Sequence, residues 1–147
     1  MSLWRRLGSC EAARRYNILK GYRTIVNIRY IAENGVDIAL LSGPAGCIPD
    51  ASAALEAAMT AKYETGAARL VIDKRMLGED FFILSTGVAG EILQKFINYH
   101  IKAAIWGDYS RYTSKPLRDF IYESNHGRDF FFVETKEEAV RKLAEAR

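Results

Sequence analysis

Three short apolar runs, separated by helical patterns, constrain the fold of this chain most strongly. The runs lie at residues 68–73, 101–106 and 130–133, and polar residues follow each of them. Apolar strands that alternate with helices of about 12 residues are typical of parallel βαβ units, because helices cover both faces of such a sheet. We therefore expect these three strands to be parallel.

A β-hairpin is expected ahead of the three runs. Residues 24–32 are rich in β-branched side chains, Asn34 and Gly35 form a turn signal, and residues 36–41 are again apolar. The next segment is rich in Gly and Pro and is expected to be a loop. Asp50 then suits the N-cap of a helix over residues 51–63.

Spacing and capping residues predict the remaining helices. An apolar stripe of period four begins at Leu84 and ends at Phe96, and the hydroxyl of Ser85 or Thr86 is expected to cap that helix. Two further helices are expected, one that begins near Thr113 or Ser114 as its cap and one that begins after Thr135. The predicted order is β-β-α-β-α-β-α-β-α, a single α/β domain whose mixed sheet has a leading hairpin and parallel strands covered by helices.

The start of the chain differs in charge from the rest. Residues 1–23 hold six basic residues against one acidic residue, whereas the whole chain of 147 residues has a formal net charge of +3. We therefore expect residues 1–22 to be a basic N-terminal extension outside the core, and residues 23–147 to be the single α/β domain. The remainder of the chain is net acidic, so a nucleic-acid-binding surface is not expected.

Composition excludes several other classes of protein. No apolar run approaches the length of about 18 residues that a membrane span needs, and no apolar stretch of a signal peptide lies between the first arginines, so we expect a cytoplasmic protein. Cys10 and Cys47 form no CxxC pair and no cluster with the two histidines, which argues against a metal site. No dinucleotide-binding glycine motif follows the first strand, so no cofactor is expected.

Two long motif blocks give the chain a family resemblance. Residues 80–96 and 107–125, which include the runs Thr86-Gly87-Val88-Ala89-Gly90 and Gly107-Asp108-Tyr109-Ser110-Arg111-Tyr112, closely resemble the bacterial domain-of-unknown-function family numbered 4180. The resemblance extends from about Arg23 to the C-terminus. It implies no activity, because that family has none assigned.

A wider similarity is to the STAS fold of anti-sigma-factor antagonists. The predicted order of elements is that of a STAS domain, and Leu84-Ser85-Thr86-Gly87 is similar to the segment in which such antagonists are phosphorylated on serine. Ser85 is the matching position, and Thr86 is the alternative. This sequence departs from the pattern at Leu84, where the antagonists have an acidic residue, and in the additional stretch 75–82.

The candidate binding residues follow the parallel strands. Ligands of α/β proteins collect at the carboxyl ends of such strands, so the residues there are expected to share one rim. The candidates are Asp73, Ser85, Thr86, Gly87, Trp106, Asp108, Tyr109, Arg111, Tyr112 and Lys115. Each also has a structural interpretation: aspartates form turns after strands, and aromatic side chains pack in the core.

These residues favour binding over catalysis. No base stands beside a nucleophile in a known motif, so no catalytic residue is assigned. We expect a non-catalytic regulatory or protein-interaction domain whose partner is another protein. The sequence leaves open whether the chain also forms a homodimer. The alternative is a small-molecule or anion-binding domain, or a small enzyme, that uses Asp73, Asp108 and the loop 107–115. A pocket lined by Asp73, Trp106 and Tyr109 would favour the alternative.

Overall fold

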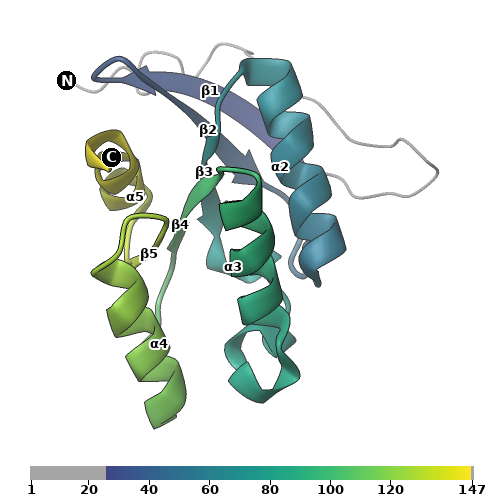
Figure 1. Cartoon of the computed structure of the whole chain (residues 1–147), viewed down its shortest axis with the longest axis vertical. Coiled ribbons are helices and arrows are strands. Elements are labelled where there is room, and N and C mark those ends of the chain that lie inside the picture. The colour runs from purple at the N-terminus through teal and green to yellow at the C-terminus, as the bar shows by residue number, and fades with distance from the viewer. Residues whose placement is uncertain (1–25, 147) are drawn as a thin grey trace.

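A five-stranded mixed sheet forms the centre of the protein, in a computed structural model that describes residues 26–146 (Figure 1). The predicted basic extension at residues 1–22 lies outside the described residues. The strands are β1 (Asn27–Glu33), β2 (Val36–Ser42), β3 (Arg69–Asp73), β4 (Lys102–Trp106) and β5 (Phe130–Val133), in that order across the sheet. β1 and β2 are antiparallel, whereas β2 to β5 are parallel. The apolar runs predicted the parallel arrangement of β3, β4 and β5.

The β1–β2 turn follows the Asn-Gly signal. Asn34 and Gly35 have φ values of 54° and 79°, the left-handed conformation that a two-residue type I′ hairpin needs at both positions. Glu33 pairs with Val36 across this turn. The first strand begins at Asn27, later than the expected residue 24.

Polar caps start three of the four α-helices formed by residues 26–146, which are α2 (Ala51–Thr65), α3 (Val88–Asn98), α4 (Lys115–Asn125) and α5 (Lys136–Glu145). The side chains of Asp50, Ser114 and Thr135 accept hydrogen bonds from backbone N–H groups in the first turns of α2, α4 and α5. Asp50 and Thr135 were predicted as caps, and Ser114 is one of the two candidates predicted for α4. Each cap satisfies a donor that would otherwise lack a partner, which typically stabilises a helix by about 1 kcal/mol. Among the described residues, no helix is long and apolar enough to cross a membrane.

The helices divide between the two faces of the sheet. Strands in sequential order with right-handed crossovers place their connecting helices on one face, and α2, α3 and α4 accordingly share one apolar core. On the other face, Val140 and Leu143 of α5 pack on a second core with Val71, Ala104 and Phe131. Figure 1 shows α2 and α3 side by side on the right and α5 on the left of the sheet.

The segment between β3 and α3 departs from the prediction. It forms three single turns of 3₁₀ helix, η2 (Lys74–Met76), η3 (Glu79–Phe82) and η4 (Leu84–Thr86), before α3 begins. A hydroxyl was expected to cap α3, and the Thr86 hydroxyl does accept a hydrogen bond from the Val88 N–H at 3.3 Å, but Thr86 does not take the N-cap position. Gly87 occupies it, with φ of 83° and no side-chain cap, because the left-handed turn that ends η4 suits glycine.

Candidate functional site

The candidate residues meet at the carboxyl ends of β3 and β4. Asp73 ends β3 and Trp106 ends β4, and the two residues are paired in register. The loop 107–114 then leads to α4, whose N-terminus faces this edge together with those of α2, α3 and α5. We call the surface formed by Asp73, Lys74, Phe82, Asp108, Tyr109, Arg111 and Tyr112 the rim.

Lys74 lies at the centre of the rim, on a pair of stacked aromatic rings. The Phe82 and Tyr112 rings are nearly parallel, with an interplanar angle of 14° and centroids 4.9 Å apart. The Lys74 Nζ lies 5.3 Å from the Phe82 centroid and 4.9 Å from the Tyr112 centroid, so it is attracted to the faces of both rings. This contact joins η2, η3 and the 107–114 loop into one unit.

Asp73 is held by its neighbour Arg75. Its carboxylate accepts hydrogen bonds from the Arg75 backbone N–H at 2.9 Å and from the Arg75 guanidinium at 2.8 Å. Partial burial acts to raise the pKa of Asp73, but the Arg75 hydrogen bonds outweigh it, so the pKa lies below its usual value. The carboxylate is charged and already occupied by local partners, as expected for a turn-forming aspartate.

The loop residue Asp108 is fixed in a similar way. Its Oδ1 accepts a hydrogen bond from the Ser110 backbone N–H at 2.9 Å. This bond, with the nearby charges of Lys74 and Arg111, lowers the pKa of Asp108. The Arg111 guanidinium is exposed and lies 6.0 Å from the Tyr112 centroid. The rim therefore presents cations that rest on aromatic rings.

Tyr109 and Trp106 do not line a common pocket. Tyr109 packs on the core under α2, α3 and α4, and its hydroxyl donates a hydrogen bond to the Ile105 carbonyl. Burial raises the pKa of Tyr109, so the phenol stays protonated. Trp106 packs on the opposite face of the sheet, below the Lys136 Nζ at 5.5 Å. Trp106, which was expected to share the rim, therefore lies on the opposite face of the sheet from Tyr109, and the described residues show no pocket lined by Asp73, Trp106 and Tyr109 that would favour the alternative.

Two other groups of candidates lie beside the rim rather than in it. Lys115 pairs with Asp119 one turn along α4, at 2.8 Å, and both side chains are largely exposed. Ser85 is exposed, and its hydroxyl makes no hydrogen bond within the described residues. The Thr86 hydroxyl, in contrast, donates towards the Asp80 and Ile83 carbonyls and accepts from the Val88 N–H. Thr86 thus ties η3 and η4 to the first residue of α3.

Sequence reasoning missed Lys74 and Phe82 as central residues of the rim. The sequence placed Lys74 at the same strand ends as Asp73 and Asp108, and Phe82 among the aromatic residues around them, but neither was among the candidate binding residues. Gly107 was also missed, although it allows Lys74 to approach: an added Cβ would lie 2.7 Å from the Lys74 Cβ. A glycine directly after a buried strand was the one available signal of such a close approach.

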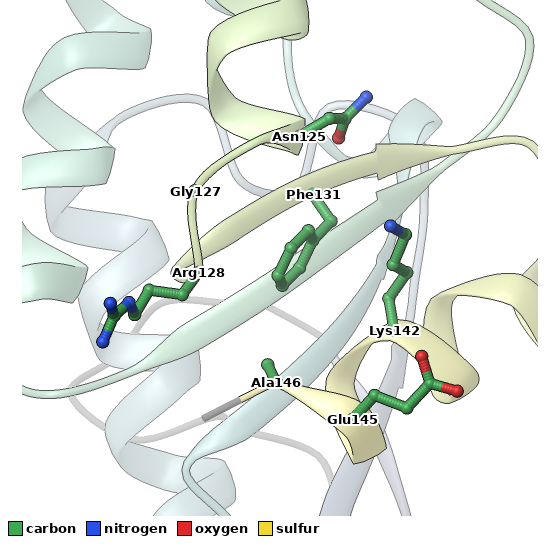
Figure 2. Close-up of a pocket in the computed structure, with 7 residues that line it drawn as sticks. All are labelled: Asn125, Gly127, Arg128, Phe131, Lys142, Glu145 and Ala146. Atoms are coloured by element: carbon green, nitrogen blue, oxygen red, sulfur yellow. The ribbon is translucent and has the colours of Figure 1, made fainter.

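A groove lies on the α5 face, away from the rim. It has a volume of about 530 Å³ and is lined by Asn125, Gly127, Arg128, Phe131, Lys142, Glu145 and Ala146. In Figure 2 the Phe131 ring forms its floor, while the Arg128 and Lys142 side chains stand on opposite sides of that ring. The two cations therefore do not converge on one position, so Arg128 and Lys142 are not placed to bind one small anion together.

Comparisons with known proteins agree with one of the two resemblances. A family model described as a domain of unknown function (DUF4180) matches residues 33–143. The match begins later than Arg23, and it contains every residue of the rim. No curated protein matches the chain. The wider similarity to STAS domains stays a prediction that rests on the order of elements and on Ser85.

Proposed function

The chain belongs to the DUF4180 family of domains of unknown function, and because that family assigns no activity, we propose its function from the rim: a non-catalytic regulatory domain that binds a protein partner there. The observation that carries this proposal is the placement of Lys74 over Phe82 and Tyr112. Lys74 and the two rings lie at the carboxyl ends of the strands, where an α/β enzyme keeps an open crevice.

The polar groups of the rim favour binding of a partner protein's surface over binding of a small ligand. An active site usually contains polar groups that converge on an open pocket and are available to bind substrate. Here Asp73 is engaged by Arg75, Asp108 by Ser110, and Tyr109 by the Ile105 carbonyl. Within the described residues, no buried side-chain polar atom lacks a hydrogen-bond partner.

The exposed groups of the rim have the chemistry of a protein interface. Arginine and tyrosine are enriched among residues that dominate protein–protein binding, because both combine a flat apolar surface with polar donors. Arg111 over Tyr112 provides such a pair at the surface, and the side chain of Arg75, which follows Lys74 in the chain, is 77% exposed. These residues would contact the partner, while Lys74 and Phe82 keep the loop in place.

The proposal is tested by charge reversal at Arg111. We expect Arg111→Glu to remove a specific partner from proteins captured by the full-length chain in host lysate, with each bound protein quantified. Arg128→Glu is the matched control, because Arg128 is also an exposed loop arginine but precedes β5, at the other end of the parallel strands. Equal loss with both variants, or no loss with Arg111→Glu, would contradict the proposal.

A regulatory role is proposed for Ser85. Its hydroxyl is exposed beside η3, so a kinase could reach it without disturbing the core. A phosphate there would add about −2 charge next to Glu79 and Asp80 and would repel an acidic partner surface. Ser85→Asp should then weaken capture of the partner that depends on Arg111, whereas Ser85→Ala should retain it. Equal capture by both variants would remove Ser85 from the proposal.

A further inference from the structure

The groove on the α5 face has two walls, and two neighbouring residues of the sheet fix them. Arg69 and Lys102 are paired in register on β3 and β4. The Arg69 guanidinium donates hydrogen bonds to the Leu143 carbonyl and, at 2.8 Å, to the Ala146 carbonyl, so it holds the last turn of α5. The Lys102 Nζ donates to the Arg128 carbonyl at 2.8 Å and so holds the turn that leads into β5. The groove is therefore preformed.

The two cations of the groove are not paired with carboxylates of residues 26–146. The Lys142 Nζ lies 5.7 Å from the centroid of the Phe131 ring. Arg128 is exposed, and Lys102 bonds to its backbone carbonyl rather than to its guanidinium. The ion pairs formed within residues 26–146 join other side chains. The side chains of Arg128 and Lys142 are therefore available to a ligand.

The acidic groups near the groove do not neutralise these cations. The Asp129 carboxylate is engaged by the Lys102 Nζ at 3.1 Å. Among the described residues that line the groove, Glu145 is the one acidic residue, against the two cations. In Figure 2 its carboxylate lies beside the last turn of α5, away from Arg128. The lining therefore carries a net positive charge.

We propose that this groove binds an acidic segment of a partner protein, with one carboxylate on Arg128 and another on Lys142. Charge complementarity selects an acidic occupant, because hydrogen bonds between cations and carboxylates are among the strongest in proteins. The placement of the two cations on opposite sides of the Phe131 ring selects a chain segment over a single small anion (Figure 2). The volume of about 530 Å³ is within the range of sites that enclose a ligand of several functional groups.

The chain's own N-terminal extension does not have this chemistry. Residues 1–23 hold six basic residues against one acidic residue, so the positive groove would repel them. A separate acidic chain is therefore the occupant that the charges favour.

The β5 edge beside the groove is closed to strand addition at Phe132. The Asn125 side chain accepts a hydrogen bond from the Phe132 N–H at 2.7 Å and donates one to the Phe132 carbonyl at 3.2 Å. These are the backbone groups that an added strand would use, and natural proteins commonly block such an edge. The acidic segment therefore binds through its side chains rather than by extending the sheet.

Titration of the ¹⁵N-labelled full-length protein with a hexaglutamate peptide tests the proposal. The peptide ends are capped, and its carboxylates occur at every spacing, so the test does not depend on one separation of the two cations. We expect shifts of the backbone amides of Gly127, Arg128 and Glu145 that a hexaglutamine peptide does not produce. These shifts should weaken as salt is added, because salt screens exposed charges.

Charge variants of α5 identify the groove as the binding site. Lys142→Glu should weaken hexaglutamate binding about fivefold or more, because repulsion replaces an exposed ion pair. Glu145→Gln should strengthen binding, because it removes the acid of the lining. Arg141→Glu is the matched control, since Arg141 is the neighbouring cation on α5 but lies outside the groove lining and pairs with Glu138 at 3.9 Å. Thermal unfolding confirms that each variant is folded.

Three results would overturn the proposal. These are no shifts at the groove amides, equal binding of hexaglutamine, and equal weakening by Lys142→Glu and Arg141→Glu. Tighter binding of a hexauridylate than of hexaglutamate would also overturn it, because the groove would then be a nucleic-acid site. The rim is measured separately: Arg128→Glu should lose hexaglutamate binding and keep the partner that depends on Arg111.

Discussion

Gly107 lies so close to Lys74 that a side chain at position 107 would displace the lysine. A Cβ there would lie 2.7 Å from the Lys74 Cβ and 3.0 Å from its Cδ. The Lys74 stem is therefore held between Gly107 and the rings of Phe82 and Tyr112, and the whole rim depends on the absence of a side chain at one position.

Gly107→Ala is therefore expected to be destabilising. Overpacking of this kind typically costs about 1–3 kcal/mol, because neighbouring side chains must leave their preferred rotamers. Urea unfolding measures the loss. Gly90→Ala is the control: Gly90 lies inside α3 with nothing within 4 Å of its added Cβ, so that variant should gain about 0.5–1 kcal/mol. Equal stability of the two variants would contradict the packing described for Lys74.

Asn125→Ala should destabilise the β5 edge. The variant leaves the Phe132 N–H and carbonyl without their side-chain partners, and loss of a partner for a buried polar group costs about 1–3 kcal/mol. Asn98→Ala is the control, because the Asn98 side chain accepts a hydrogen bond from the Gln94 side chain on the exposed surface of α3. Hydrogen exchange should show faster exchange at Phe132 in Asn125→Ala alone. Unchanged exchange at Phe132 would contradict the role assigned to Asn125.

Thr86 and Ser85 should respond differently to loss of their hydroxyls. Thr86→Ala removes hydrogen bonds to the Asp80 and Ile83 carbonyls and should reduce the free energy of unfolding by about 1 kcal/mol. Ser85→Ala should be neutral within about 0.5 kcal/mol, because it is an exposed position. Thermal unfolding of both variants distinguishes them. A larger loss for Ser85→Ala than for Thr86→Ala would show that their roles are reversed.

Asp73 should contribute to stability at neutral pH and lose that contribution in acid. Its pKa is lowered in the folded protein, so the folded state favours the charged carboxylate. The contribution is fully present above the unfolded value of about 3.9 and is lost as the pH falls through the lower folded value. Urea unfolding from neutral pH to about pH 2 should therefore show a weaker pH dependence for Asp73→Asn than for the wild type. Identical pH profiles would contradict the Asp73–Arg75 ion pair.

Much of the fold could be predicted because its signals are local. The runs at β3, β4 and β5 are apolar throughout, and Asp50, Ser114 and Thr135 each cap a helix within three residues of themselves. The segment 74–86 could not be predicted. Its three 3₁₀ turns depend on contacts with residues far along the chain, such as the stacking of Phe82 on Tyr112.

The candidate site was predicted in position but not in arrangement. The carboxyl ends of parallel strands located the rim, and most of the loop 107–112 does lie there. The alternation of side chains along β4 already separates Ile105 from Trp106, so the error at Trp106 was avoidable from the strand pattern. No pattern, however, indicated that Asn125 would bond to Phe132, because that contact requires the folded positions of α4 and β5.

Site-specific photo-crosslinking tests the central claim, binding of a protein partner at the rim, most directly. A photoreactive residue would replace Ser110, which is exposed next to Arg111, in the full-length protein in its host. A second variant would carry it at Tyr63, which is 90% exposed at the end of α2. We predict a discrete crosslinked protein from position 110 that is absent from position 63 and is lost with Ser85→Asp or competing unlabelled wild type. Crosslinks at position 63 alone, or the same diffuse adducts from both positions, would contradict the claim.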